Sequence, residues 1–81
     1  MTQEEIRNRA RAILAKVLKA DIETLTDEIS QMELSDWDSL SHMNVVLGLE
    51  NEFDIEFDDA ELPKLTSLPL MVASIERHTS S

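Results

Sequence analysis

The 81-residue sequence has no cysteine and only two histidines, His42 and His78. Disulfide bonds and thiolate metal sites are therefore excluded, and we expect no metal site of any kind. No apolar run approaches the ~20 residues that a membrane-spanning helix needs. Residues 4–11 carry several charges, unlike a secretory signal. These absences predict a cytoplasmic protein that does not associate with membranes.

Basic residues are also scarce. Seven Lys and Arg stand against seventeen Asp and Glu, which gives a net charge of −10. Residues 20–63 contain fourteen of the acids and no Lys or Arg. Such a surface repels nucleic acid phosphates and attracts proteins with basic patches. We expect no nucleic-acid partner and protein partners with basic docking surfaces, although an acidic surface that only maintains solubility is the alternative.

One glycine, two prolines and no extended alternation of polar and apolar residues favour helices over a sheet. Apolar residues at helical spacing predict a first helix over residues 2–19, which Thr2 and Glu5 begin as a capping box. Residues 20–38 hold isolated apolar side chains among polar ones, and they predict a long ordered loop with one helical turn. A loop of this length in so small a domain is usually functional.

A second helix is predicted to begin at Ser39, with Asp38 as its cap, and to end near Phe53. A short turn of helix around residues 59–62 is predicted to end at Pro63. The inward residues of a last helix, which begins near residue 66, are predicted to be Leu70, Met71, Val72 and Ile75.

These elements predict an all-α fold, a small four-helix bundle with three main helices and one short helix. We expect one domain over residues 1–81, a frayed tail over residues 79–81, and a monomer.

The predicted second helix carries apolar residues on two faces. One face suits the core and consists of Val45, Val46, Leu49 and Phe53. Leu40, Met43 and Leu47 form a second stripe, also at spacings of three and four. This stripe is either buried beneath the 20–38 loop or exposed for a partner. Methionine suits a surface that docks against several different proteins.

The triplet Asp38-Ser39-Leu40, together with residues 49–57 (Leu-Glu-Asn-Glu-Phe-Asp-Ile-Glu-Phe), resembles the acyl carrier protein family. That family has an Asp-Ser-Leu triplet at the start of its second helix and a run like Leu-Glu-x-Glu-Phe-Asp-Ile at its end. The order of the other predicted elements also agrees, so the resemblance covers nearly the whole chain.

The sequence departs from the family pattern in two places. Asp36-Trp37 stands where Gly-x is common, and Ser41, His42 and Asn44 stand where many members carry acids. A Trp-Asp-Ser-Leu string of this kind is more typical of free-standing carriers from specialised pathways. We predict that Trp37 anchors the loop on the bundle and that His42 is solvated.

The resemblance implies that a separate phosphopantetheinyl transferase, of the holo-acyl carrier protein synthase type, attaches 4'-phosphopantetheine from coenzyme A to Ser39. The thiol of this arm would carry acyl cargo as a thioester for enzymes of fatty acid, polyketide or related lipid biosynthesis. The chain itself would not be an enzyme. Asp38 and Leu40 would flank the attachment site and help the transferase recognise it. The implied docking residues for partner enzymes are Leu40, Met43, Leu47, Glu50 and Glu61.

The residues themselves make Ser39 a sensible attachment point, because the start of a helix stabilises an anion such as a phosphodiester. A hydrolase triad is disfavoured, since Ser39 and His42 lie one turn apart without an oxyanion hole. A calcium loop from Asp54 fails because Asp59 and Leu65 replace the required glycine and glutamate. An aminoacyl or peptidyl carrier and an unmodified acidic interaction module remain as alternatives.

Overall fold

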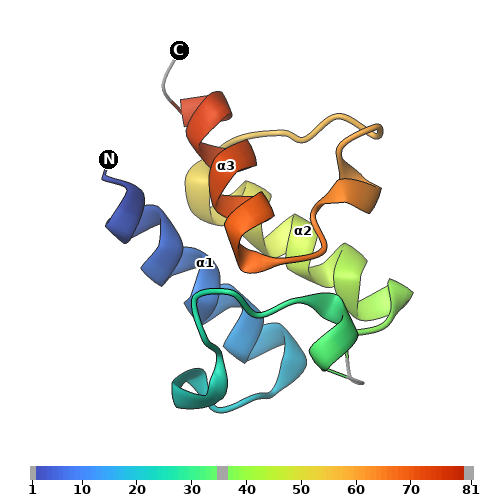
Figure 1. Ribbon diagram of the computed structural model, residues 1–81. Helices are drawn as coiled ribbons and strands as arrows, with labels where there is room; N and C mark the ends of the chain where they lie inside the picture. The colour runs from blue at the N-terminus through green and yellow to red at the C-terminus, as the bar shows by residue number, and fades with distance from the viewer. Residues whose placement is uncertain (1, 35–36, 80–81) are drawn as a thin grey trace.

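The computed structural model describes residues 2–34 and 37–79. It contains three α-helices, α1 (Gln3–Leu18), α2 (Ser39–Phe53) and α3 (Leu68–Thr79), which pack together with α1 against both other helices (Figure 1). Three 3₁₀-helices lie in the connections: η1 (Ile22–Thr24), η2 (Gln31–Glu33) and η3 (Leu62–Lys64). The start of α1 and the end of α3 lie at the same end of the bundle (Figure 1).

This architecture confirms the predicted all-α bundle of three main helices and one short helix. The only strand-like pairing in residues 2–34 and 37–79 is an isolated bridge between Ser30 and Ser67. The long connection between α1 and α2 holds two helical turns, η1 and η2, where the sequence predicted one.

The starts of α1 and α2 lie where the capping residues predicted them. Thr2 Oγ1 accepts a hydrogen bond from Glu5 N at 3.1 Å, and Asp38 Oδ1 accepts one from Ser41 N at 2.8 Å. Each helix stops at a residue in the left-handed region, Lys19 with φ 54° and Asp54 with φ 53°. The N–H of each of these residues returns to a carbonyl four residues earlier, which satisfies an otherwise unpaired acceptor.

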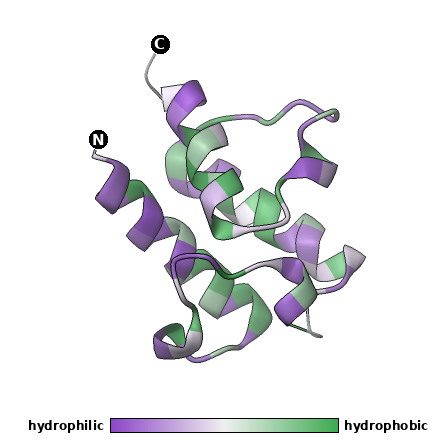
Figure 2. Cartoon of the chain, in the orientation of Figure 1, coloured by the Kyte–Doolittle hydropathy of each residue, from purple (hydrophilic) through white to green (hydrophobic). Residues whose placement is uncertain are grey.

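The apolar faces of the three helices meet in one core (Figure 2). Its fully buried members include Ile6, Leu14, Val45, Leu49, Leu65, Leu68, Met71 and Ile75. The inward positions predicted for α3 are confirmed for Met71, Val72 and Ile75. The prediction was wrong for Leu70, which is 48% exposed. Leu68 is the first inward residue of α3, and a residue two positions later points to the opposite side of a helix.

Two further details differ from the sequence prediction. Pro63 lies within η3 instead of ending it, because the first turn of a helix needs no proline N–H. Residues 59–61 form a turn that leads into η3. Thr79 was assigned to a frayed tail but is the last residue of α3, and its hydroxyl donates to the Ile75 carbonyl at 2.9 Å. The rest of the predicted tail, residues 80–81, lies outside the described residues.

The loop after α1 is tied to the other helices on its way to α2. Arg11 of α1 forms an ion pair with Asp27. Beyond it, Leu68 N donates to the Ile29 carbonyl at 2.9 Å, which joins the loop to the start of α3. Trp37 closes the loop and is only 2% exposed, which confirms its predicted role as an anchor.

Candidate functional site

Ser39 is the first residue of α2 and is exposed to solvent. The preceding residue, Asp38, has extended backbone angles, and its carboxylate accepts the Ser41 N–H. This hydrogen bond lowers the pKa of the Asp38 carboxyl. The first N–H groups of a helix have no carbonyl partner within it, and the helix dipole is positive at this end. The site therefore combines an accessible hydroxyl with a local field that stabilises a phosphate group.

The residues just before Ser39 are held by hydrogen bonds from both backbone and side-chain groups. Trp37 N donates to the Leu34 carbonyl at 3.1 Å, and Gln31 Nε2 donates to the Trp37 carbonyl at 2.9 Å. The Asp38 carbonyl in turn accepts from His42 N at 2.8 Å. Asp36, the other residue of the unusual Asp-Trp pair, lies outside the described residues. Ser39 thus follows a well-anchored turn on a framework made by η2 and α2.

His42 was predicted to be solvated, and this prediction was wrong. Its side chain is buried, with 9% exposed, and both ring nitrogens have hydrogen-bond partners. The reason can be read from helical spacing, because His42 precedes Val45, Val46 and Leu49 by three, four and seven residues. It lies on the core face of α2, not beside Ser39 on the exposed side.

The second apolar stripe of α2 is exposed. Leu40, Met43 and Leu47 have exposed fractions of 74%, 44% and 53%. The 20–38 loop therefore does not bury them. The sequence left open whether this stripe is buried beneath the loop or exposed, and the structure shows it exposed. Met43 and Leu47 also line a shallow groove of about 430 Å³ between α2 and residues 54–62.

The two acids predicted to dock partners are both held within the chain. Glu50 Oε2 accepts from Phe57 N at 2.8 Å. Glu61 is bound more extensively, with Ser74 Oγ at 2.6 Å and His78 Nε2 at 3.0 Å. Hydrogen bonding from the Ser74 hydroxyl is the main cause that lowers the pKa of Glu61 to about 2. Hydrogen bonds within the chain therefore fix both side chains, and of the two only Glu50 lines the groove beside Met43 and Leu47.

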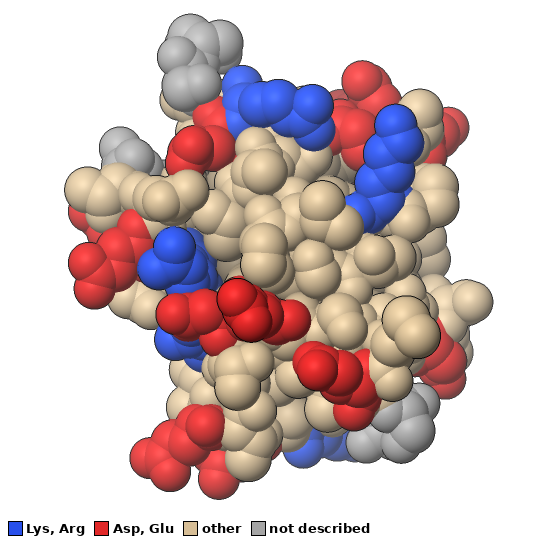
Figure 3. Space-filling view, viewed as in Figure 1, with Lys and Arg blue, Asp and Glu red and all other residues tan. Residues whose placement is uncertain are grey.

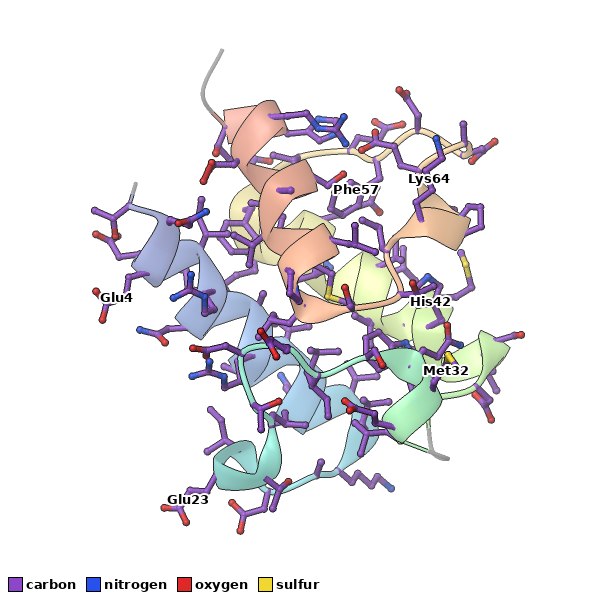
Figure 4. The ribbon with its side chains drawn as sticks, in the orientation of Figure 1. Glu4, Glu23, Met32, His42, Phe57 and Lys64 are labelled. Carbon is purple, nitrogen blue, oxygen red and sulfur yellow. The ribbon has the colours of Figure 1, made fainter. Side chains whose placement is uncertain are left out.

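Besides Leu70, sequence reasoning missed the most exposed large apolar side chain among the described residues. Met32 of η2 is 97% exposed, and the sequence showed it only as an isolated apolar residue in a polar loop (Figure 4). Its exposure follows from the geometry of η2, whose other members face the loop and Trp37.

Residues 2–34 and 37–79 contain no cluster of three or more His, Asp or Glu side chains able to hold a metal ion. None of the helices in this part of the chain combines the length and apolar character that crossing a membrane requires.

A family profile described as "Phosphopantetheine attachment site" matches residues 8–75, which include Ser39 and the whole of α2. The chain belongs to this family of acyl carrier proteins. The family consists of carrier proteins rather than enzymes, and its prosthetic group is 4'-phosphopantetheine.

Individual proteins of this family are similar to most of the chain. An acyl carrier protein of Thermotoga maritima is 30% identical over 76 residues, with 94% of each chain covered. Polyketide-8 synthase acyl carrier protein 2 of Streptomyces avermitilis is 36% identical over 62 residues, which cover 76% of this chain and 71% of that protein. The solution structure of a holo acyl carrier protein from Geobacter metallireducens superposes with a TM-score of 0.80 at 31% identity and covers 91% of this chain and 85% of that one.

The surface of the carrier carries charged side chains around an uncharged area. On the face drawn in Figure 3, acidic and basic side chains both lie around this area, with the acidic ones in the majority. The exposed Ser39 hydroxyl lies at the capped start of α2, where the helix end stabilises an anion, and the exposed apolar stripe follows it along the helix.

Proposed function

We propose that this carrier bears its 4'-phosphopantetheine arm on Ser39, holds acyl intermediates there as thioesters, and presents them to enzymes of fatty acid, polyketide or related lipid biosynthesis. The observation that carries the proposal is the exposed Ser39 hydroxyl at the first position of α2, between Asp38 and Leu40. The terminal thiol of the bound arm supplies the thioester linkage.

In the loading step, Ser39 Oγ attacks the phosphorus that bears the pantetheine group of coenzyme A. A new O–P bond forms, the P–O bond to the nucleotide half breaks, and adenosine 3',5'-bisphosphate leaves. The hydroxyl proton passes to a base of the transferase, which also holds the magnesium ion. The chain's own contribution is to present Ser39: the Asp38 carboxylate accepts the Ser41 N–H and so caps the first turn of the helix on which Ser39 lies.

The partner enzymes dock on a surface that begins at Ser39 and follows α2. Leu40, Met43 and Leu47 supply its apolar part, and their exposure supports this assignment. Glu50 and Glu61 supply negative charge at its far end for basic residues of the partners. Met32, exposed on η2, extends the apolar area.

A polyketide pathway is the more specific candidate, and the Streptomyces avermitilis relative favours it. The Thermotoga maritima relative, which covers more of the chain, favours a carrier without that specialisation. Acyl cargo distinguishes these pathways. Hydroxylamine releases it from the native holo protein as a hydroxamate, whose mass separates a fatty acyl, a polyketide and an aminoacyl or peptidyl group.

The attachment itself is tested by the intact mass of the protein before and after incubation with coenzyme A and a broad-specificity phosphopantetheinyl transferase. We expect a gain of one phosphopantetheine for the wild type and none for Ser39→Ala. Ser41→Ala is the matched control, since it removes the nearest other hydroxyl, and it should still be loaded. No gain with several transferases would reject attachment and promote an unmodified acidic interaction module.

A further inference from the structure

Gln31 joins η2 to the turn before Ser39 through one side-chain hydrogen bond. The residue is half-buried, and its Nε2 donates to the Trp37 carbonyl at 2.9 Å. The hydrogen-bond ladder of α2 begins one residue after Trp37, where the Asp38 carbonyl accepts from His42 N. The Trp37 carbonyl therefore needs a donor from outside the helix, and the Gln31 amide supplies it.

The segment that carries Gln31 is itself firmly held. Ser30 N donates to Glu33 Oε2 at 3.2 Å, which closes η2 on itself. Gln31 N donates to the Thr66 carbonyl at 2.7 Å, and Ser30 pairs with Ser67 in the isolated bridge. Figure 1 shows η2 between the start of α3 and the start of α2. The Gln31 side chain thus reaches the turn before Ser39 from a support that is fixed to α3.

This hydrogen bond fixes the peptide group that precedes the attachment site. A peptide group is planar, so holding the Trp37 carbonyl also sets the direction of the Asp38 N–H. Asp38 then enters α2 with φ −89° and ψ −176°, and its carboxylate accepts the Ser41 N–H. The buried indole holds the Trp37 side chain but does not by itself set the rotation of the following peptide. Ser39 therefore lies between two anchors, the Gln31 amide before it and the Asp38 carboxylate after it.

We propose that Gln31 is a positioning residue of the loading site, whose amide holds the Trp37–Asp38 peptide, and with it Ser39, in the orientation that the transferase binds. Without this bond the turn adopts other orientations in the free carrier, and the transferase has to order it on binding. That cost raises the KM of loading, whereas kcat is unchanged because the turn is in place once bound. The proposal deepens the proposed function and rests on attachment at Ser39.

The test measures loading by a phosphopantetheinyl transferase in three variants of Gln31. Gln31→Met keeps the length of the side chain without a donor, and we expect the KM to rise about fivefold, the change that corresponds to one lost hydrogen bond. Gln31→Glu offers only acceptors to the Trp37 carbonyl and should raise the KM at least as much. Gln31→Lys restores a donor and should have the lowest KM of the three variants. The kcat should be the same in all.

Attraction by overall charge predicts the opposite order. A transferase with a basic docking surface binds a carrier with one more acid more tightly, and a carrier with one more lysine more weakly. Gln3→Glu and Gln3→Lys are the matched controls, because Gln3 is the other glutamine of the chain and is exposed on α1. They measure the charge effect alone. A KM for Gln31→Glu equal to or lower than that for Gln31→Lys would overturn the proposal.

Thermal unfolding followed by far-ultraviolet circular dichroism separates positioning from stability, and loading is measured where each variant is folded. A purely structural role would lower the melting temperature of Gln31→Met and leave its KM unchanged, which would also overturn the proposal. If Gln31→Glu does not fold, Gln31→Met and Gln31→Lys decide, because only the lysine donates, and equal KM values would reject the proposal. Failure of the proposed function is distinct, because then the wild type gains no phosphopantetheine.

Discussion

The hydrogen-bonded Glu61 carboxylate offers a quantitative test of the structure through Glu61→Gln. Glu61 joins the segment before η3 to the last turns of α3 through Ser74 and His78, with Arg77 Nη2 at 3.7 Å. Glutamine keeps the size of the side chain and a carbonyl acceptor, so the substitution removes mainly the charge. The side chain of Glu61 is 17% exposed, and solvent therefore screens part of the interaction. We expect the free energy of unfolding to fall by about 1–2 kcal/mol at pH 6.

The pH dependence of this loss follows from linkage. The pKa of Glu61 is lowered from 4.5 to about 2 in the fold, so the folded state favours the charged form more than the unfolded chain does. The stabilisation is complete above about pH 5, declines as the pH falls toward about 2, and is absent below that. The difference between wild type and Glu61→Gln should therefore shrink across this window and vanish at its acid end.

Urea unfolding at a series of pH values measures the difference directly. Thermal unfolding is an independent check, with a shift of roughly 4–8 °C for each kcal/mol in a chain of this size. Glu56→Gln is the matched control, because it makes the same charge change at an exposed position in the same segment. The net charge of −10 means that removing any carboxylate relieves some repulsion, and Glu56→Gln measures that effect. A Glu61→Gln variant as stable as Glu56→Gln, or a difference unchanged at pH 2, would refute the reasoning.

Three further predictions concern packing, docking and charge. Gly48→Ala would place a Cβ 2.9 Å from Ile13 Cγ2, and we expect this overpacking to outweigh the gain in helix propensity and to lower stability by about 1 kcal/mol. An unchanged or raised melting temperature would contradict it. Leu47→Ala should change stability by less than about 0.5 kcal/mol, since the side chain is 53% exposed, yet raise the KM of partner enzymes for the loaded carrier. Equal kinetics with several partners would remove Leu47 from the docking surface. Added salt or a divalent cation should raise the melting temperature by screening the acids, and a flat or falling response would show that repulsion does not limit stability.

Local signals account for what the sequence predicted correctly. The starts of α1 and α2 depend on Thr2 and Asp38, each of which accepts a hydrogen bond from a residue three positions later, and such local contacts can be predicted from the sequence. The core faces of these helices follow from the 3.6-residue period. The position of Ser39 at the start of α2 and the existence of a second apolar stripe likewise follow from one helix, but the sequence left open whether that stripe is buried or exposed.

Contacts between segments far apart in the chain account for the features that the sequence did not predict. Glu61 meets Ser74 and His78 across 13 and 17 residues, and His42 meets Leu62 across 20. No local sequence pattern indicates such pairs. The burial of His42 is an intermediate case, since its spacing from Val45 and Val46 placed it on the core face, whereas its partners came only from the fold.

The exposure of the α2 stripe follows from how the long loop is attached. A helix with apolar residues on two faces would ordinarily bury both, and the 20–38 loop is long enough to cover the second. The loop is instead held by α1 through Arg11 and Asp27, and by α3 through the backbone bonds at Ile29. It returns to α2 only at Trp37, whose indole is buried on the His42 side of the helix, away from Leu40 and Leu47. The ties of the loop to α1 and α3 therefore leave the apolar stripe beside Ser39 exposed.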